Sequence, residues 1–317
     1  MPFFASLRYV CAMLPAAMAA LSLTAQETVH SAPIEVTHGK PFVMATVNGQ
    51  GPFRFVIDTG TGGDAIVTGE LADRLGLPAA GQVKLNDPSG LGEKVVPAVL
   101  IRSLQIDGIM FTGVKAVRHN LSDQDGPCQG VLGFALFRDF LFTLDYPNRQ
   151  ITLASGSLAA DGGRSVLPFA MPFGVPIVGL SVGDLRFDAL IDSGGEGLSL
   201  PENLASRMKF AVDPVAFANG QSLSTRFQLK AARMAADVRL GEYIFEHSFV
   251  EINPAFPLAN LGSCPMRNFA LTFDQKNLLV RLRASRKRFT LSATPTAIRL
   301  VNAPLPKPLD PNLVPVG

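Results

Sequence analysis

Short apolar runs recur along the chain between residues 33 and 283, and glycine, proline, asparagine or aspartate residues separate them. Runs of this length with turn-forming residues between them are typical of β-strands. One short helix is expected in each half. The first begins at a capping Thr68 and can close at Gly76, and the second begins at Pro201, which suits a first helical turn. The pattern therefore predicts an all-β fold with a few short helices.

The same apolar pattern leads twice to an aspartate. FRFVIDTGTGG at 53–63 and FDALIDSGGEG at 187–197 both read Phe, two residues, an aliphatic residue, Ile, Asp, a hydroxyl residue and Gly. Burying a charge is costly unless the charge is paired or hydrogen-bonded, so a carboxylate at the end of an apolar strand needs a special environment. Asp58 and Asp192 are therefore the first candidates for chemistry.

Two further pairs of segments repeat in register. IDGIMF at 106–111 and LGEYIF at 240–245 are as far apart in sequence as the two aspartates. Residues 131–153 align without gaps with residues 260–282, and eight of the 23 positions are identical. An internal repeat of this length predicts two homologous lobes.

The repeat sets the expected domain boundaries. The first lobe spans residues 33–153 and the second spans 170–283, and the small, polar segment 154–169 has the composition of a linker. Residues 284–317 form a tail that is first basic and then proline-rich, which predicts an extended segment without a core of its own. We interpret the basic run at 281–288 as solvated surface.

The first 25 residues have the features of a targeting segment. Arg8 precedes an apolar stretch that ends in small residues, and polar residues begin after Ala25. This order is typical of a cleavable secretory signal peptide over residues 1–25. A retained membrane anchor is the alternative, but the stretch is short for a span and contains Pro15. We expect a periplasmic or secreted protein whose mature form is a monomer with no membrane segment.

Charge and histidine spacing argue against several kinds of partner. The net charge is only +2, and no basic patch is interleaved with aromatic residues, so we expect no nucleic-acid partner. The four histidines are scattered and have no metal-ligand spacing, so we expect no metal site among them. They are His30, His38, His119 and His247.

Two other patterns carry less weight. The glycines at 60–65 fit a dinucleotide-binding pattern after a strand, but the chain lacks the alternating strands and helices of that fold. Cys128 and Cys264 remain once the signal segment is removed, and an oxidising compartment would permit a disulfide between them. The spacing cannot establish a bridge, and two free thiols are the alternative.

The two aspartates share a wider context. Each is followed at once by a hydroxyl residue and a glycine. Later in the same lobe comes a short motif that ends in Leu-Gly, which is VLG ending at Gly133 in the first lobe and NLG ending at Gly262 in the second. This arrangement resembles the aspartic peptidase family. The two-lobed layout is similar to pepsin-type enzymes, and the short lobes look more like the retropepsin-like bacterial branch. The resemblance implies a bilobal fold with a pseudo-two-fold axis and an active site in the cleft between the lobes.

The resemblance also implies the chemistry, which needs no metal and no cofactor. Asp58 and Asp192 would be the catalytic pair, and the resemblance implies that they lie next to each other in the cleft. Two neighbouring carboxylates share a proton, as in aspartic proteases generally. One would act as the base on a water, and the other, protonated, would polarise the carbonyl of a peptide or protein substrate. The other implied site residues are Thr59 and Ser193 as a cross-brace, Gly60 and Gly194 at the carboxylates, and Gly133 and Gly262 in the strands behind them.

A flap and an asymmetry complete the expectations. The hairpin NDPSGLGE should form a mobile flap, with Ser89, Gly90, Leu91 and Gly92 at its tip. Thr61 can donate a hydrogen bond to the outer oxygen of Asp58, whereas the equivalent Gly195 cannot do so for Asp192. This difference predicts that the shared proton lies mainly on Asp192. It also leaves open a catalytically silent relative that uses the cleft to bind peptides.

Overall fold

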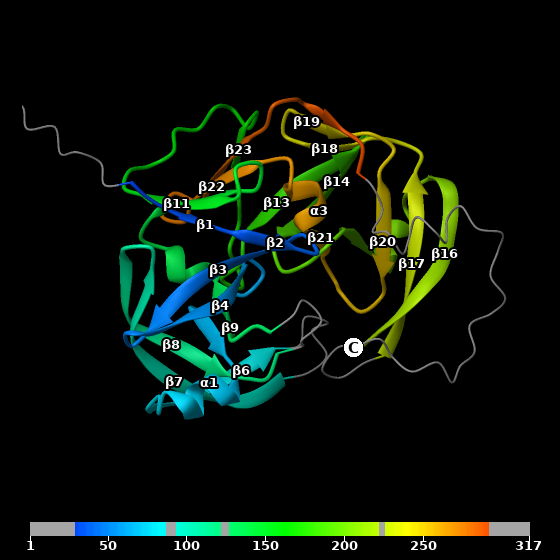
Figure 1. The fold of residues 1–317 in the computed structure, drawn as a ribbon. Coiled ribbons are helices and arrows are strands. Elements are labelled where there is room, and N and C mark those ends of the chain that lie inside the picture. Colours follow the sequence, from blue (N-terminus) through cyan, green and yellow to red (C-terminus); the bar gives the residue numbers. More distant parts are fainter. Residues whose placement is uncertain (1–28, 87–92, 122–126, 222–225, 292–317) are drawn as a thin grey trace, which may run out of the picture.

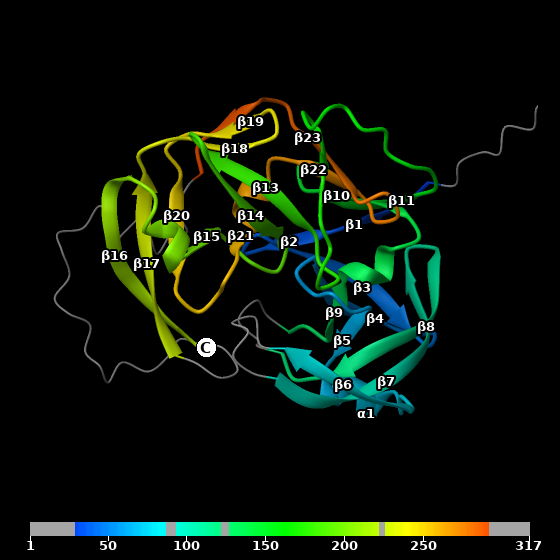
Figure 2. The same cartoon turned by 180° about the vertical axis from the view of Figure 1, so that it is seen from behind.

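The computed structural model describes residues 29–86, 93–121, 127–221 and 226–291. The described part is mostly β-strand with a few short helices, which confirms the all-β prediction. Figures 1 and 2 show two β-rich lobes, with β10, β11, β22 and β23 lying where the lobes join. The predicted signal peptide, the tip of the flap and the proline-rich end of the tail lie outside the described residues.

The first lobe is built on an eight-stranded sheet with the order β2-β3-β4-β9-β5-β8-β7-β6. Helix α1 (Gly69–Arg74) begins as predicted, because the Thr68 hydroxyl accepts the N–H of Leu71, and Gly76 follows its end with a positive φ of 56°. The strands of this sheet are β2 (Glu35–Thr37), β3 (Lys40–Val47), β4 (Gln50–Asp58), β5 (Ala65–Val67), β6 (Ala79–Asn86), β7 (Glu93–Ile106), β8 (Ile109–Arg118) and β9 (Gly130–Gly133).

The second lobe is built on a ten-stranded sheet with the order β16-β17-β20-β15-β21-β14-β13-β18-β19-β24. Its helix α2 (Glu202–Ala205) has Pro201 as the capping residue, one position before the first turn in which proline was expected. The strands are β13 (Ile177–Val182), β14 (Leu185–Ile191), β15 (Leu198–Pro201), β16 (Phe210–Gln221), β17 (Arg226–Met234), β18 (Val238–Leu240), β19 (Tyr243–Phe245), β20 (Phe249–Asn253), β21 (Ala259–Leu261) and β24 (Arg288–Phe289).

A six-stranded sheet takes strands from both halves, in the order β1-β11-β10-β22-β23-β12. Thr143 and Thr272 are equivalent residues of the repeat, and they face each other across the β10–β22 pair with hydroxyl oxygens 2.9 Å apart. The pseudo-two-fold axis therefore passes between them. The strands are β1 (His30–Pro33), β10 (Leu141–Asp145), β11 (Gln150–Ala154), β12 (Val166–Pro168), β22 (Ala270–Asp274) and β23 (Leu279–Arg283).

Two short strands lie where the sequence predicted a linker and a tail. Strand β12 falls inside 154–169 and pairs with β23, and its Leu167 is buried. Strand β24 follows residue 283 and pairs with β19, and its Phe289 is buried. The basic run beside β24 is a solvated surface, as interpreted, and Lys287 pairs there with Glu242.

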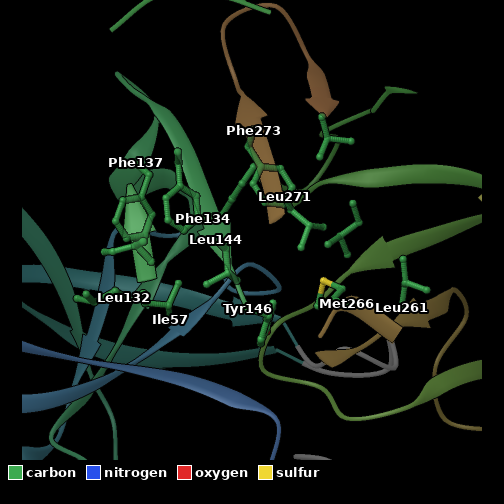
Figure 3. Close-up of a cluster of buried hydrophobic side chains, with 14 of the residues drawn as sticks. Ile57, Leu132, Phe134, Phe137, Leu144, Tyr146, Leu261, Met266, Leu271 and Phe273 are labelled. Atoms are coloured by element: carbon green, nitrogen blue, oxygen red, sulfur yellow. The ribbon is translucent and has the colours of Figure 1, made fainter. Parts of the chain in front are cut away.

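Aromatic side chains from both halves pack together where the lobes meet (Figure 3). Phe273 of β22 lies edge-on to Phe134, with ring centroids 5.1 Å apart, and stacks with Phe142 of β10 at 6.0 Å. Phe142 in turn stacks on Phe137 at 4.1 Å. The two lobes thus share one continuous core. No helix in the described part of the chain is long and apolar enough to cross a membrane.

Candidate active site

Asp58 and Asp192 lie at the ends of equivalent strands. Strand β4 ends at Asp58 and runs parallel to β9, with Asp58 opposite Gly133. Strand β14 ends at Ile191 and runs parallel to β21, with Ile191 opposite Leu261. In each lobe the strand that leads to the glycine of VLG or NLG, β9 or β21, lies between the aspartate strand and the next one, β5 or β15. Each carboxylate therefore lies at the end of a buried pair of parallel strands, next to the other lobe.

Four hydrogen bonds cross-brace the two aspartate loops. The N–H of Thr59 donates to Ser193 Oγ at 3.0 Å, and the N–H of Ser193 donates to Thr59 Oγ1 at 3.0 Å. Each hydroxyl then donates to a backbone carbonyl of the opposite lobe, Thr59 to Ile191 and Ser193 to Ile57, both at 2.7 Å. Both side chains are buried, so the loops are fixed to each other from beneath.

Glycine at 60 and 194 leaves room for the two carboxylates. A Cβ on Gly60 would lie 2.6 Å from Asp192 Oδ1 and 3.1 Å from Asp58 Oδ1, and a Cβ on Gly194 would lie 2.7 Å from Asp58 Oδ2. The N–H of Gly60 donates to Asp58 Oδ1 at 2.8 Å, and that of Gly194 donates to Asp192 Oδ1 at 2.9 Å. The carboxylates thus meet between two glycines that also supply hydrogen bonds.

The pair is arranged to hold one proton. Burial, the charge of Asp192 and a hydrogen bond with Asp192 together raise the pKa of Asp58 to about 7, against the hydrogen bonds from Thr61 and Gly60, which lower it. A carboxyl group with this pKa keeps its proton through the acidic range. One protonated and one ionised carboxyl side by side form a general acid and a general base.

Asn260 is the site residue that the sequence reasoning missed. Thr61 Oγ1 donates to Asp58 Oδ2 at 2.9 Å as expected, but Asn260 Nδ2 donates to Asp192 Oδ2 at 2.6 Å. The N–H of Gly195 adds a bond to Asp192 Oδ1 at 3.0 Å. The prediction that Asp192 has no donor at its outer oxygen is therefore wrong, and the placement of the shared proton on Asp192 loses the argument on which it rested. The available signal was a polar residue at 260 where the first repeat has Val131.

The glycines of VLG and NLG both lie behind the aspartate loops, but only Gly133 lies in a strand as the resemblance implied, whereas Gly262 follows β21 and caps the next helix. Gly133 ends β9, and a Cβ there would overlap the carbonyl oxygen of Gly63. Gly262 follows β21, and a Cβ there would lie 2.7 Å from the carbonyl oxygen of Gly197. Each glycine lets its strand approach the aspartate loop closely.

The flap and the cysteines have different outcomes. Ser89, Gly90, Leu91 and Gly92 lie outside the described residues, and the strands β6 and β7 that lead to them pair up to Asn86 and Glu93. Cys128 and Cys264 are free thiols in the two different lobes. The structure therefore does not form the bridge that an oxidising compartment would permit.

Among the described residues, no group of three His, Cys, Asp or Glu side chains could hold a metal ion. Comparison with known proteins gave a match to a family model and matches to solved structures. Residues 43–136 match the family model named Aspartyl protease. A retropepsin-like aspartic protease from Rickettsia conorii is 25% identical with a TM-score of 0.31, over 41% of this chain and 93% of its own. No curated protein matches the chain. The family match confirms the resemblance to aspartic peptidases in the lobe that carries Asp58.

Proposed function

We propose that this chain, whose first lobe matches the aspartyl proteases, is an aspartic endopeptidase that uses Asp58 and Asp192 together. One observation carries the proposal. The two carboxyl groups come from equivalent loops, meet between Gly60 and Gly194, and form a hydrogen-bonded pair with a raised pKa at Asp58. Perturbed carboxyl pairs of this kind are characteristic of acid–base catalysis.

The reaction follows from a pair that holds one proton. The ionised carboxylate takes a proton from a water whose oxygen bonds to the substrate carbonyl carbon, and the other carboxyl gives its proton to the carbonyl oxygen. The gem-diol then collapses as the C–N bond breaks. The leaving nitrogen takes the proton held by the first carboxyl, and a hydroxyl returns a proton to the second. The cross-brace of Thr59 and Ser193 supports these steps by holding the carboxylates in place.

The alternative is a catalytically silent relative that binds peptides in the same cleft. The sequence permits this alternative because Gly195 supplies no hydroxyl to Asp192. The hydrogen bond from Asn260 fills that role, so the second carboxylate is supported at both of its oxygens. This observation favours a working peptidase over the silent binding protein.

We further propose that the protein acts on peptide or protein substrates in the periplasm or outside the cell, as a monomer that needs no metal or cofactor. The N-terminal segment 1–25 with its single Arg8 supports export by a cleaved signal peptide. The low net charge gives no support for a nucleic-acid partner.

Substitution of either aspartate tests the function. Asp58→Asn and Asp192→Asn should each lower the cleavage rate of a denatured protein by about 10³-fold or more, because each removes one half of the acid–base pair. The wild-type cleavage should also be blocked by pepstatin. The rate is measured by following the appearance of fragments with purified, folded proteins.

The matched control is Asp139→Asn, because Asp139 is an exposed aspartate whose partner is the surface residue Lys276. This control should cleave at the wild-type rate. Cleavage by Asp58→Asn or by Asp192→Asn near the wild-type rate would refute the peptidase proposal. Peptide binding without cleavage by the wild type would favour the silent alternative.

A further inference from the structure

The two carboxylates have chemically different partners at their outer oxygens. Asp58 Oδ2 faces the hydroxyl of Thr61, and Asp192 Oδ2 faces the amide nitrogen of Asn260. A hydroxyl can donate or accept, whereas an amide nitrogen can only donate. The Thr61 contact therefore suits Asp58 Oδ2 with or without a proton on that oxygen, and the Asn260 contact suits Asp192 Oδ2 only when that oxygen carries no proton.

This difference is built into the packing of the second lobe. In the first lobe, Thr61 provides the donor and Val131 occupies the position equivalent to Asn260. In the second lobe, a Cβ on Gly195 would lie 2.9 Å from both Asn260 Nδ2 and Asp192 Oδ2. Glycine at 195 thus makes the space that the amide group fills. The donor is thus a loop hydroxyl, Thr61, in the first lobe and a strand amide, Asn260 of β21, in the second.

The remaining hydrogen bonds act in the same direction. Asp192 accepts from Asn260 and from the N–H groups of Gly194 and Gly195, and Asp58 accepts from Thr61 and Gly60. Hydrogen bonds donated to a carboxylate favour its charged form. The amide oxygen of Asn260 is buried without a partner among the described residues, so the contribution of this side chain to the pair is its donation.

We propose that Asn260 is a positioning residue that keeps Asp192 ionised, so that the shared proton lies on Asp58 in the free protein. Resting on the proposed function, this assigns Asp192 as the base that takes the proton of the water and Asp58 as the acid that gives its proton to the carbonyl oxygen. The raised pKa of Asp58 agrees with this assignment.

Other titratable groups lie near the two aspartates, and their titration must be distinguished from that of the pair. Burial, followed by the charges of Asp192 and Asp58, raises the pKa of the Tyr146 phenol, which therefore stays neutral. Burial, followed by the charge of Glu196, raises the pKa of Glu251 to about 7. Burial also raises the pKa of Cys264, with smaller effects from its charged neighbours Arg267, Glu196 and Glu251. On the first-lobe side, Asp64 is paired with Arg138.

Two matched substitutions give opposite results under the proposal. Losing a donor destabilises every state in which its carboxylate is ionised. If Asp192 ionises first, Asn260→Val destabilises the product of the first proton loss and raises the pKa of that step alone. Thr61→Val then destabilises the doubly ionised state most, because a hydrogen bond to a charged carboxylate is stronger than one to a neutral carboxyl, and it raises the pKa of the second step alone. The reverse assignment exchanges the two results.

The experiment titrates the pair directly by NMR of protein labelled with ¹³C at the aspartate carboxyls, and Asp58→Asn and Asp192→Asn assign the signals. All variants carry Glu251→Gln, which removes the group that titrates in the same range. Asn260→Val should raise the first apparent pKa by about 0.5–1 unit and leave the second in place, and Thr61→Val should do the opposite. Adding Gly195→Thr to Asn260→Val should reverse the shift, because it restores a first-lobe type of donor.

Several results would overturn the assignment. It is wrong if Asn260→Val raises only the second step or neither step, or if Thr61→Val raises the first. The Thr61→Val titration decides the matter even if Asn260→Val does not fold. Because the titration needs no turnover, it tests the proton position even if no variant cleaves a substrate, which would refute the proposed function alone. With activity, the acid limb of the kcat/KM profile should move to higher pH in Asn260→Val.

Discussion

At the scale of single residues, the cross-brace is the most exacting part of the site. Ser193 Oγ accepts the N–H of Thr59 and donates to the carbonyl of Ile57, and all of these atoms are buried between the lobes. Ser193→Ala would leave that N–H and that carbonyl unpaired, which should lower the free energy of unfolding by about 1–3 kcal/mol. Urea denaturation measures the loss.

The control for the brace is Ser31→Ala, which removes an exposed hydroxyl bonded only to Thr152. Its free energy of unfolding should stay close to that of the wild type. Thr59→Ala should behave like Ser193→Ala, because the two hydroxyls have equivalent bonds. An unchanged denaturation midpoint for both brace variants would mean that these bonds do not hold the loops together.

Residues that the two lobes have in common could be predicted from the sequence, and the residue that breaks the repeat could not. Asp58 and Asp192, like Thr59 and Ser193, occupy equivalent positions, so the repeat pointed to them directly. Asn260 has an apolar equivalent, and its partner lies 68 residues earlier in the chain. Only the parallel pairing of β14 with β21 brings the amide to the carboxylate.

At the scale of elements, the repeat predicted positions more accurately than local pattern did. Strands β10 and β22 begin and end at equivalent residues, and so do β11 and β23. The short helices after β9 and β21, which are η1 (Phe134–Phe137) and α3 (Ser263–Met266), are equivalent as well. Strands β12 and β24 were missed because they are three and two residues long and depend on pairing with distant strands.

The turn after β22 gives a prediction about acid stability. Burial would raise the pKa of Asp274, but hydrogen bonds from Asn277 and from the N–H of Leu158 lower it below its usual value. A lowered pKa stabilises the folded protein above the pKa of the unfolded chain, near 4, and this stabilisation is lost as the pH falls through the folded value. Asp274→Asn places an NH₂ group among these donors. This substitution should lower the free energy of unfolding by about 1–3 kcal/mol at pH 7.

The measurement compares wild-type and Asp274→Asn denaturation between pH 7 and pH 2. The difference in the free energy of unfolding should narrow below about pH 4, because the wild-type carboxylate becomes protonated there. Asp139→Asn, at an exposed position, should show no such narrowing. A constant difference across this range would show that the charge of Asp274 does not stabilise the turn.

At the scale of the whole molecule, the six-stranded sheet joins the two lobes that carry the carboxylates. Its β10 and β22 come from different halves and meet at Thr143 and Thr272, on the pseudo-two-fold axis. The cross-brace lies between the lobes as well, so the site is complete only when both lobes are folded and joined. The sequence repeat predicted the two lobes. It did not predict that the terminal strands of each repeat pair with one another, because that pairing depends on the contact between lobes.

Phe273 tests whether the lobes unfold together. It is fully buried, belongs to the second repeat, and packs against Phe134 and Phe142 of the first. Phe273→Ala should lower the free energy of unfolding by about 3–5 kcal/mol, because it leaves a cavity in the shared core. Hydrogen exchange should accelerate equally in the aspartate strands β4 and β14, whereas Met110→Ala, at an exposed position, should change neither. Faster exchange in β14 alone would show that the second lobe opens by itself, and the carboxyl pair would then be lost before the first lobe unfolds.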